Sequence, residues 1–365
     1  MMDLENNCLM NFGSVYRNKK IFLTGHTGFK GSWLLYWLHS LGAVVKGYAL
    51  VPENKNDLYN QMGGDKFCSS VIADIRDHKK LEQELISFEP DFVFHLAAQP
   101  LVRLSYELPE ETFEVNTMGT AYVLKALRKL KKPCTVILIT TDKVYENKEW
   151  IYPYRESDRL GGLDTYSASK ACAELVIQSY VHSFFHTSKF SAHQKAIAVA
   201  RAGNVIGGGD WAKDRIIPDI VRSLQAGKNL TVRNPMAVRP WQHVLDPLGG
   251  YLLLGQKLHT DPLKNIGAWN FGPHPEDNLT VEDLVKIALK KWGSGEYEKP
   301  VLENQPHEAG LLKLDISKAI TKLGWNPKWN SVIAIEKTML WYKMNMVKDA
   351  AELIEQDIKN YTQGE

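Results

Sequence analysis

The regular hydrophobic pattern of the chain begins near residue 20, where short apolar runs start to alternate with longer amphipathic stretches. Short runs rich in branched apolar residues are typical of buried strands, and apolar positions three and four apart are typical of helices. Six strands are predicted, at 20–24, 44–50, 70–73, 92–96, 135–140 and 196–201. Helices are predicted between them, at 30–41, 77–88, 110–131 and 166–185. This alternation favours an α/β fold with one parallel sheet that helices cover on both faces.

Six strands joined by right-handed helical crossovers are typical of the doubly wound parallel sheet of a Rossmann fold. Beyond the sixth strand the alternation stops, and Gly, Pro, Trp and Arg become frequent in 203–218 and 233–247. This composition predicts irregular structure that faces a ligand. Two further helical stretches, at 280–292 and 331–358, predict a smaller mixed lobe at the C-terminal edge of the sheet.

Two lobes with a cleft between them fit the length of the chain, because 365 residues exceed what one compact core usually holds. The predicted Rossmann domain is 1–202, with 240–265 returning to it. The predicted substrate lobe is 203–239 together with 266–365.

Composition and charge narrow the possible partners. Hydrophobic residues make up 44% and charged residues 24%, as in ordinary soluble globular proteins. The 44 Lys and Arg residues nearly balance the 42 Asp and Glu residues, which leaves a formal charge of +2. No broad basic field of the kind that attracts nucleic acid is expected, so nucleic acid is not a predicted partner.

The cysteines and the first residues carry no sign of a metal site or of export. Cys8, Cys68, Cys134 and Cys172 lie far apart and form no CxxC pair, so neither a bound metal nor a disulfide framework is predicted. Residues 1–20 are polar and lack the apolar core of a secretory signal. No stretch approaches the roughly 18 apolar residues of a membrane span. We therefore expect a cytoplasmic protein that does not bind membranes.

A glycine-rich turn follows the first predicted strand and precedes the first predicted helix. Gly25 suits a tight turn, Gly28 lets the backbone approach a pyrophosphate, and Gly31 permits close packing of the helix. The N–H groups at the start of the helix then face the phosphates. The order of strand, turn and helix predicts a dinucleotide site. Its predicted members in this turn are Gly25, Thr27, Gly28, Phe29, Lys30 and Gly31.

The GxxGxxG spacing of this turn resembles that of the extended short-chain dehydrogenase/reductase family, the NAD-dependent epimerases and dehydratases. Asp74-Ile75 after the third strand resembles the family's adenine-contacting pair. Leu96-Ala97-Ala98-Gln99 after the fourth strand resembles its cofactor-lining turn, and Asn116 matches an asparagine of a family helix. The resemblance implies that these residues, together with Thr140, contact the cofactor.

The second strand leaves the choice of dinucleotide open. NAD-selective Rossmann proteins usually carry Asp or Glu at its end, where the carboxylate binds the ribose hydroxyls. Here the segment reads Tyr48-Ala49-Leu50-Val51. Lys30 in the glycine turn could instead accept the 2′-phosphate of NADP. The family resemblance favours NAD, and NADP stays an alternative.

A Tyr-x-x-x-Lys pair lies on the helix predicted after the fifth strand. Tyr166 and Lys170 are four residues apart, so both side chains lie on one helix face. The ammonium group, together with a positive nicotinamide ring, is expected to lower the pKa of the Tyr166 phenol. A phenolate there would take the proton of an alcohol as its hydride leaves. Both residues are also expected to contact the cofactor.

Thr140-Thr141-Asp142-Lys143 stands at the carboxyl end of the fifth strand, where ligands bind in this architecture. Thr141 is expected to hydrogen-bond the sugar hydroxyl that Tyr166 deprotonates. Simple epimerases of the family have Ser or Thr here without an adjacent acid and base, whereas 4,6-dehydratases of nucleoside-diphosphate hexoses have Asp-Glu. The Asp142-Lys143 pair resembles the CDP-glucose 4,6-dehydratase branch of the family. The segments 25–33, 201–211 and 239–248 resemble it as well.

This resemblance implies a redox-neutral removal of water from CDP-glucose. Oxidation at C4 acidifies the C5 proton, a base removes that proton, an acid protonates the departing C6 hydroxyl, and hydride returns to C6. Asp142 is suited to be the acid if burial favours its protonated form. Lys143 stands where related enzymes have the base, a role that requires an uncharged amine in a site without water. A surface ion pair at the strand end is the alternative for both residues.

The two segments rich in Gly, Pro, Trp and Arg are expected to bind the sugar nucleotide. Guanidinium groups suit pyrophosphate oxygens, and aromatic rings suit a pyrimidine face. By resemblance, the predicted contacts are Asn204, Asp210, Trp211, Arg215, Arg233 and Arg239. His243 is expected to pack structurally. His307-Glu308 resembles a family loop to which no role is assigned.

Three functions remain compatible with these motifs. The first is a 4,6-dehydratase acting on CDP-glucose for the deoxysugars of surface polysaccharides such as the lipopolysaccharide O-antigen. The second is a nucleotide-sugar 4-epimerase, which would share the cofactor motifs and differ at Asp142 and Lys143. The third is a non-catalytic NAD(P)-binding sensor, a class that usually lacks the set formed by Thr141, Tyr166 and Lys170. The family resemblance also implies a homodimer or homotetramer.

Overall fold

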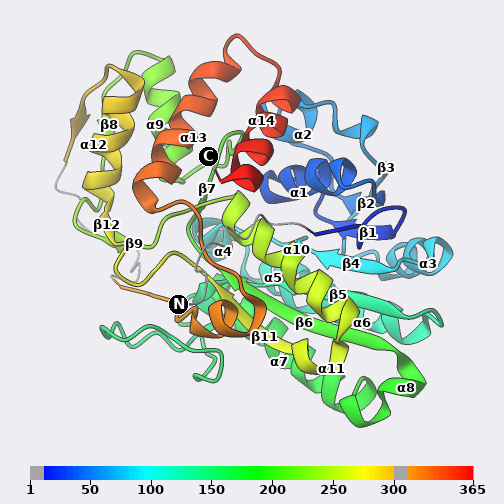
Figure 1. The fold of residues 1–365 in the computed structure, drawn as a ribbon. Coiled ribbons are helices and arrows are strands. Elements are labelled where there is room, and N and C mark those ends of the chain that lie inside the picture. The colour runs from blue at the N-terminus through cyan, green and yellow to red at the C-terminus, as the bar shows by residue number, and fades with distance from the viewer. Residues whose placement is uncertain (1–11, 300–310, 365) are drawn as a thin grey trace, which may run out of the picture.

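The computed structural model describes residues 12–299 and 311–364. Its centre is one parallel sheet of seven strands in the order β11-β6-β5-β4-β1-β2-β3 (Figure 1). The strands are β1 Lys20–Thr24, β2 Val44–Ala49, β3 Ser69–Ile72, β4 Phe92–His95, β5 Cys134–Ile139, β6 Lys195–Ala202 and β11 Gly267–Phe271. The strand order reverses between β1 and β4, and Rossmann folds bind their ligands at such a reversal.

Helices cover both faces of this sheet. The helices α3 (His78–Phe88), α6 (Gly119–Lys129) and α7 (Thr165–Phe184) pack on one face. The helices α1 (Phe29–Ser40) and α10 (Leu245–Thr260) pack on the other. The strands can serve both faces because successive side chains of a strand point to opposite sides.

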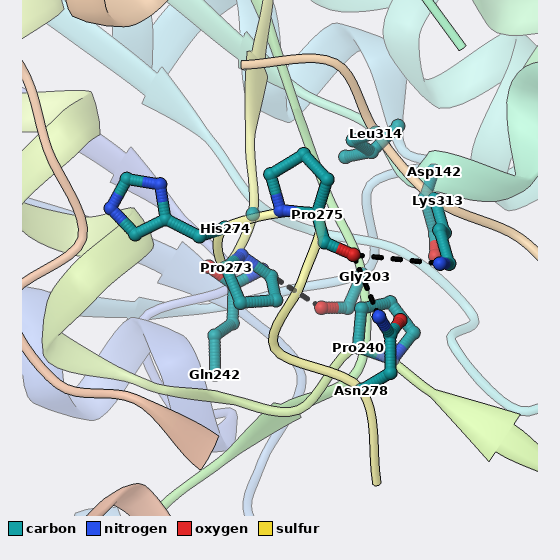
Figure 2. Close-up of a pocket in the computed structure, with 11 residues that line it drawn as sticks. Asp142, Gly203, Pro240, Gln242, Pro273, His274, Pro275, Asn278, Lys313 and Leu314 are labelled. Atoms are coloured by element: carbon teal, nitrogen blue, oxygen red, sulfur yellow. Dashed lines mark hydrogen bonds between the residues drawn. The ribbon is translucent and has the colours of Figure 1, made fainter. Parts of the chain in front are cut away.

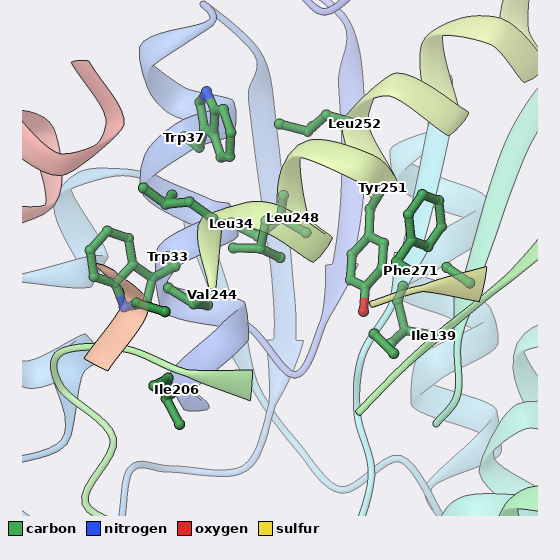
Figure 3. Packing of buried hydrophobic residues seen from close by; sticks show 14 of the residues in the cluster. Trp33, Leu34, Trp37, Ile139, Ile206, Val244, Leu248, Tyr251, Leu252 and Phe271 are labelled. Atoms are coloured by element: carbon green, nitrogen blue, oxygen red, sulfur yellow. The ribbon is translucent and has the colours of Figure 1, made fainter. Parts of the chain in front are cut away.

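The face under α1 and α10 carries the larger of the two apolar cores. Trp33 and Trp37 of α1 lie beside Leu248 and Leu252 of α10, and all four side chains are 1% exposed or less (Figure 3). The indole N–H of Trp33 is satisfied by the backbone oxygen of Gly208 at 2.9 Å. This contact ties the helix that follows the glycine turn to the segment after β6.

Further helices and three small sheets complete the described part of the chain. The longer helices are α9 Ile216–Gln225, α12 Val281–Trp292, α13 Ser331–Asn345 and α14 Ala350–Gln363, and the short ones are α2 Leu58–Gln61, α4 Val102–Glu107, α5 Pro109–Phe113, α8 Phe190–His193 and α11 Pro262–Asn265. Three two-stranded sheets pair β7 Val205–Ile206 with β10 Gln242–His243, β9 Val238–Arg239 with β12 Leu279–Thr280, and β8 Leu230–Thr231 with β13 Tyr297–Glu298. No helix in the described part of the chain is both long and apolar enough to cross a membrane.

All six predicted strands are present, within two residues at each end, so the prediction of a doubly wound parallel sheet is confirmed. The sheet has a seventh strand, β11, which pairs with β6 and was not predicted. Its five residues, Gly-Ala-Trp-Asn-Phe, are too short and mixed to stand out as an apolar run. The predicted helix 331–358 is in fact two helices, α13 and α14.

The predicted helix 110–131 is also interrupted. A π-helical turn, Glu114–Met118, separates α5 from α6. Such a turn inserts one residue into a helix and often occurs at functional sites. Here it carries Asn116, whose side chain is buried and faces the turn after β4.

Candidate active site

A cleft of about 2030 Å³ lies at the carboxyl ends of the central strands. Its walls come from the glycine turn after β1, from the turns after β4, β5 and β6, and from the segment 209–219. Most of the site residues predicted from the sequence line it: Gly25, Thr27, Gly28, Phe29, Lys30, Gly31, Asp74, Ile75, Leu96, Ala97, Ala98, Thr140, Thr141, Asp142, Lys143, Tyr166, Asn204, Asp210, Trp211, Arg215, Arg233 and Arg239. Gln99, Asn116 and Lys170 do not line it.

The glycine turn has the backbone shape that a pyrophosphate needs. Gly25 has a positive φ of 75°, and a Cβ there would lie 2.7 Å from the backbone nitrogen of Ala97. A Cβ on Gly31 would overlap the backbone oxygen of Gly25. Gly28 precedes the first turn of α1, and a Cβ there would meet only one atom within 4 Å. The start of α1 is therefore open to the cleft, where its N–H groups can bind an anion.

The side chain of Asn116 forms two hydrogen bonds with the backbone of Gln99. The Oδ1 atom of Asn116 accepts from the backbone N–H of Gln99 at 2.9 Å, and Nδ2 donates to the Gln99 oxygen at 3.1 Å. Nδ2 also donates to Ser169 Oγ on α7 at 2.9 Å. Asn116 therefore joins the turn after β4 to the helix that carries Tyr166 and Lys170.

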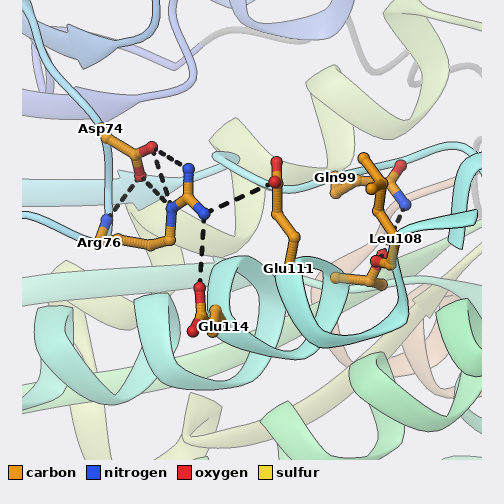
Figure 4. A network of polar contacts seen from close by, with 7 residues as sticks. Asp74, Arg76, Gln99, Leu108, Glu111 and Glu114 are labelled. Carbon is orange, nitrogen blue, oxygen red and sulfur yellow. Dashed lines mark hydrogen bonds and ion pairs between the residues drawn. The ribbon is translucent and has the colours of Figure 1, made fainter.

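Asp74 lies in the cleft but is held by an arginine that the sequence reasoning missed. Arg76 donates to the Asp74 carboxylate with its backbone N–H at 2.8 Å and with its guanidinium at 2.6 to 3.1 Å (Figure 4). These hydrogen bonds lower the pKa of Asp74. Arg76 also faces Glu111 at 3.7 Å and Glu114 at 3.4 Å. The sequence could have indicated this pair, because an acid and a base two residues apart, Asp74 and Arg76, follow shortly after β3.

The end of β2 itself carries no carboxylate, but the loop that follows brings Glu53 and Asp57 to the cleft beside apolar and amide side chains. Leu50 and Val51 are 59% and 65% exposed and line the cleft, as do Asn54 and Asn56 in the loop that follows. The hydroxyl of Thr27 donates to the Leu50 oxygen at 2.9 Å, which joins this loop to the glycine turn. The two asparagines are polar candidates for ribose contacts that the sequence reasoning missed.

The reactive residues meet where β5 ends. Asp142 and Lys143 belong to a short 3₁₀ turn, Asp142–Val144, which Thr141 caps. The Thr141 hydroxyl donates to Asp142 Oδ1 at 2.9 Å and lies within hydrogen-bonding reach of Tyr166. Asp142 and Tyr166 are 2% and 8% exposed. An acid, a phenol, a hydroxyl and an amine thus face one end of the cleft.

The expected lowering of the Tyr166 pKa is not found. Burial raises the pKa of this phenol to about 12, and the Thr141 hydrogen bond opposes the shift without cancelling it. Burial lowers the pKa of Lys170 to about 8, while Glu174 acts in the raising direction. Desolvation is the largest cause of both pKa shifts, because both groups lie in the interior. A positive nicotinamide ring, when bound, would lower the phenol's pKa.

Lys30 lies with the reactive residues. Burial lowers the pKa of Lys30 to about 7, and the charges of Lys170 and Arg215 push it the same way, while Asp142 opposes them. These neighbours lie in the turn after β5, within α7 and in the segment after β6. Its surroundings therefore give no support to the alternative in which Lys30 accepts the 2′-phosphate of NADP.

A buried ion pair supports the strand ends from behind, and the sequence reasoning did not include it. Arg201 of β6 and Glu174 of α7 form it, with side chains 2% and 1% exposed. Glu174 also accepts from Thr140 Oγ1 at 2.7 Å, and Arg201 donates to Tyr145 Oη at 2.7 Å. Glu174 lies one helical turn after Lys170, so the sequence could have indicated that the two side chains share one face of α7.

The predicted substrate residues form ion pairs along one wall of the cleft. Arg215 pairs with Asp210 at 2.9 Å, which raises the pKa of Arg215. Arg233 pairs with Asp214 at 3.0 Å. Arg103 of α4, which the sequence reasoning missed, faces the same Asp214 at 3.6 Å and lines the cleft. Its position shortly after β4 could have indicated a residue of the cleft, because ligands bind at the carboxyl ends of these strands.

The other residues predicted to bind the substrate come from the segment after β6 and from β9. Asn204 has a positive φ of 50°, a conformation that asparagine tolerates better than most residues. Arg239 ends β9, and Trp211 follows Asp210. His243 is fully buried against Trp33 and Trp329 outside the cleft, as expected for a structural residue. His307-Glu308 lies outside the described residues.

Comparison with known proteins decides the family. The model of a family described as GDP-mannose 4,6 dehydratase matches residues 22–338. The chain belongs to this family. A CDP-glucose 4,6-dehydratase from Salmonella typhimurium, strain LT2, is 48% identical over 328 residues, which are 90% of this chain and 91% of that protein. These findings confirm the resemblance seen in the motifs.

Solved structures agree on the fold. A dTDP-glucose 4,6-dehydratase from Streptomyces venezuelae with NAD and TYD bound has a TM-score of 0.76 at 24% identity, over 89% of this chain and 97% of that one. A UDP-glucose 4-epimerase from Thermotoga maritima has a TM-score of 0.76 at 21% identity, over 90% and 99%. At these identities the likeness extends to the fold alone.

Proposed function

We propose that the protein is an NAD-dependent lyase that removes water from CDP-glucose to give CDP-4-dehydro-6-deoxyglucose. The observation that carries the proposal is the position of the Asp142-Lys143 pair, which shares one cleft with Tyr166 and the glycine turn. The relative that is 48% identical is a CDP-glucose 4,6-dehydratase, which supports the same reaction and substrate.

The shape of the cleft fits NAD. Gly25 and Gly31 have no room for a Cβ, and Gly28 leaves the start of α1 open to phosphate oxygens. We assign the pyrophosphate to this turn and the adenine to the wall that holds Asp74 and Ile75. The solved relative with NAD bound supports NAD over NADP. A bound NAD would supply the acceptor for the hydride of C4 and the donor of the hydride to C6.

Tyr166 removes the proton of the C4 hydroxyl in the first step. Thr141 orients that hydroxyl, since its own hydroxyl lies within reach of the Tyr166 oxygen. Lys170 acts as a cation behind the phenol: in the free protein its pKa is about 8, so it is mostly charged at pH 7. Asn116 and Ser169 hold the helix that presents both groups.

Asp142 and Lys143 carry out the elimination. The step requires Lys143 as the free amine, which takes the C5 proton, and Asp142 as the carboxylic acid, which gives its proton to the C6 hydroxyl. That hydroxyl then leaves as water. Lys143 then returns a proton to C5 as hydride reaches C6. Over one cycle Tyr166 gains one proton and Asp142 loses one. When Tyr166 releases its proton and Asp142 takes one up, the enzyme returns to its starting state with no net change in protons.

The sugar nucleotide is assigned to the wall formed after β6. We propose that Arg215, Arg233 and Arg239 face its pyrophosphate and that Trp211 faces the cytosine ring, because guanidinium forks match phosphate oxygens. Asn204 and Asp210 complete the set. We further propose two domains, as predicted from the sequence. Residues 1–202 with 240–265 bind the dinucleotide, and residues 203–239 with 266–365 bind the substrate.

The setting of the enzyme is proposed on the same basis. We propose a cytoplasmic homodimer or homotetramer whose product supplies deoxysugars of surface polysaccharides such as the lipopolysaccharide O-antigen. The exposed side chains of Leu175 on α7 and Met118 in the adjoining π-helical turn, 55% and 42% exposed, support pairing through this flank.

A 4-epimerase is the second candidate, since an epimerase shares the fold at a TM-score of 0.76. An epimerase has no use for a second acid–base pair beside the threonine. Asp142, buried and held by Thr141, therefore favours the dehydratase.

A substrate panel tests the proposal. CDP-glucose, dTDP-glucose, GDP-mannose and UDP-glucose are each incubated with the NAD-loaded enzyme, and the keto-deoxy product is followed by its absorbance in alkali. We expect CDP-glucose to exceed the others in kcat/KM by on the order of 10²-fold or more, since a pocket built to hydrogen-bond one group can reject an analogue without it by up to roughly 10⁴- to 10⁵-fold. Higher kcat/KM with another nucleotide would refute the nucleobase assignment. A CDP-hexose product that retains its C6 hydroxyl would favour the epimerase.

A further inference from the structure

A second, small cavity of about 10 Å³ lies next to the large cleft. Its lining includes Pro240, Gln242 and Leu314 (Figure 2). Gly272, which follows β11, also lines it. Asp142 and Gly203 line both cavities. These two residues therefore form the partition between the large cleft and the small cavity.

Hydrogen bonds fix only one end of the Asp142 carboxyl group. Oδ1 accepts from Thr141 Oγ1 at 2.9 Å. Oδ2 is buried and has no hydrogen-bond partner among the described residues. The orientation of the carboxyl group thus depends on what packs against it.

Gly203 packs directly against this carboxyl group. A Cβ atom on Gly203 would overlap the Asp142 carboxyl carbon and both of its oxygens. The backbone of Gly203 does not adopt a positive φ, so glycine is not needed there for its conformation. The three atoms nearest to such a Cβ all belong to the Asp142 carboxyl group, so the absence of a side chain makes room for Asp142.

The backbone of Gly203 cannot easily move away, because Gln242 holds it. Nε2 of Gln242 donates to the Gly203 oxygen at 2.8 Å and to the Phe271 oxygen of β11 at 3.2 Å. The backbone N–H of Gln242 donates to the Asn204 oxygen at 3.2 Å. Gln242 itself is 1% exposed.

We propose that Gly203 is a positioning residue for Asp142: its bare Cα, clamped by Gln242, sets the angle at which the Asp142 carboxyl group faces the C6 hydroxyl. The inference rests on the role proposed for Asp142. A methyl group at position 203 turns or shifts the carboxyl group, and misplacing a catalytic group by about 1 Å can cost on the order of 10²-fold in rate.

Gly203→Ala tests this inference, with Gly272→Ala as the matched control. Gly272 also lines the small cavity, but a Cβ there would lie no closer than 3.6 Å to any neighbour. We expect Gly203→Ala to lower kcat for dehydration by on the order of 10²-fold with little change in KM. Rapid-quench samples should contain reduced cofactor and 4-ketohexose, since the first hydride transfer is not affected. Gly272→Ala should keep parental rates.

A double-mutant cycle separates this inference from the proposal beneath it. If Gly203 acts through Asp142, adding Gly203→Ala to Asp142→Asn should cause little further loss. If Asp142→Asn dehydrates slowly while Gly203→Ala dehydrates at the parental rate, the inference on Gly203 is wrong and the role proposed for Asp142 stands. Parental elimination by Asp142→Asn overturns the role of Asp142, and the inference falls with it.

Folding offers a second test if Gly203→Ala is not obtained in folded form. The double variant Asp142→Ala/Gly203→Ala removes the group that the new methyl meets. We expect it to have the same thermal midpoint as Asp142→Ala alone. A double variant that fails to fold, beside a folded Asp142→Ala, would overturn the inference, because the obstacle would then be another group.

Discussion

Tyr166→Phe is expected to lower turnover by on the order of 10² to 10⁴-fold, the range usual for one positioned acid–base group. The substitution deletes only the oxygen to which we assign the C4 proton, and the ring keeps its place in a site where Tyr166 is 8% exposed. Stopped-flow measurement of nicotinamide reduction with CDP-glucose checks it. The first hydride transfer itself should be slow, so no reduced cofactor should build up.

The control for this variant is Tyr16→Phe. Tyr16 is a buried phenol outside the cleft, and its hydroxyl donates to the Leu252 oxygen at 2.5 Å. Losing this oxygen should reduce the thermal midpoint while leaving kcat unchanged. Near-parental turnover by a folded Tyr166→Phe enzyme would rule out Tyr166 as the base at C4.

Asp142→Asn and Lys143→Met are each expected to slow the release of water by on the order of 10²-fold or more. Asn keeps the hydrogen bond from Thr141 but cannot give up a proton to the departing hydroxyl. Met keeps much of the volume of Lys and has no amine to take the C5 proton. The defect should therefore lie after the oxidation at C4.

The first half of the reaction is the internal control for these variants. Rapid quenching should trap a 4-ketohexose together with reduced cofactor at amounts near one per active site. Elimination at the parental rate in both variants would show that the acid and the base are other residues of the cleft. Slow oxidation at C4 would show instead that the substitutions disturb Thr141 or Tyr166.

The sequence predicted those parts of the site that depend on strand ends. Strands alternate with helices, so the residues that follow β1, β4 and β5 had to meet at one edge of the sheet, whatever the loops do. The glycine turn and the stretch from Thr140 to Lys143 lie at that edge and line the cleft. Their position follows from chain order alone.

The sequence could not predict contacts that depend on side-chain packing between distant segments. Asn116 and Lys170 do not line the cleft, and the side chain of Asn116 hydrogen-bonds Ser169 on α7. Their contact with the cofactor stays a prediction. Gly203 stood in a recognised motif without a role, since its contact with Asp142 joins the ends of β5 and β6. The desolvation that raises the pKa of Tyr166 is likewise a property of the packed interior.

The path of the hydride tests the dehydratase assignment most directly. CDP-glucose carrying deuterium at C4 is converted by the NAD-loaded enzyme, and the product is examined by mass spectrometry and proton NMR. Deuterium should appear on the C6 methyl group, because the hydride taken from C4 returns to C6 in the same cycle. In heavy water, unlabelled substrate should gain deuterium at C5, where a solvent-exchangeable base removed the proton. Deuterium that stays at C4 with no water released, or that passes into the free cofactor pool, would contradict the assignment.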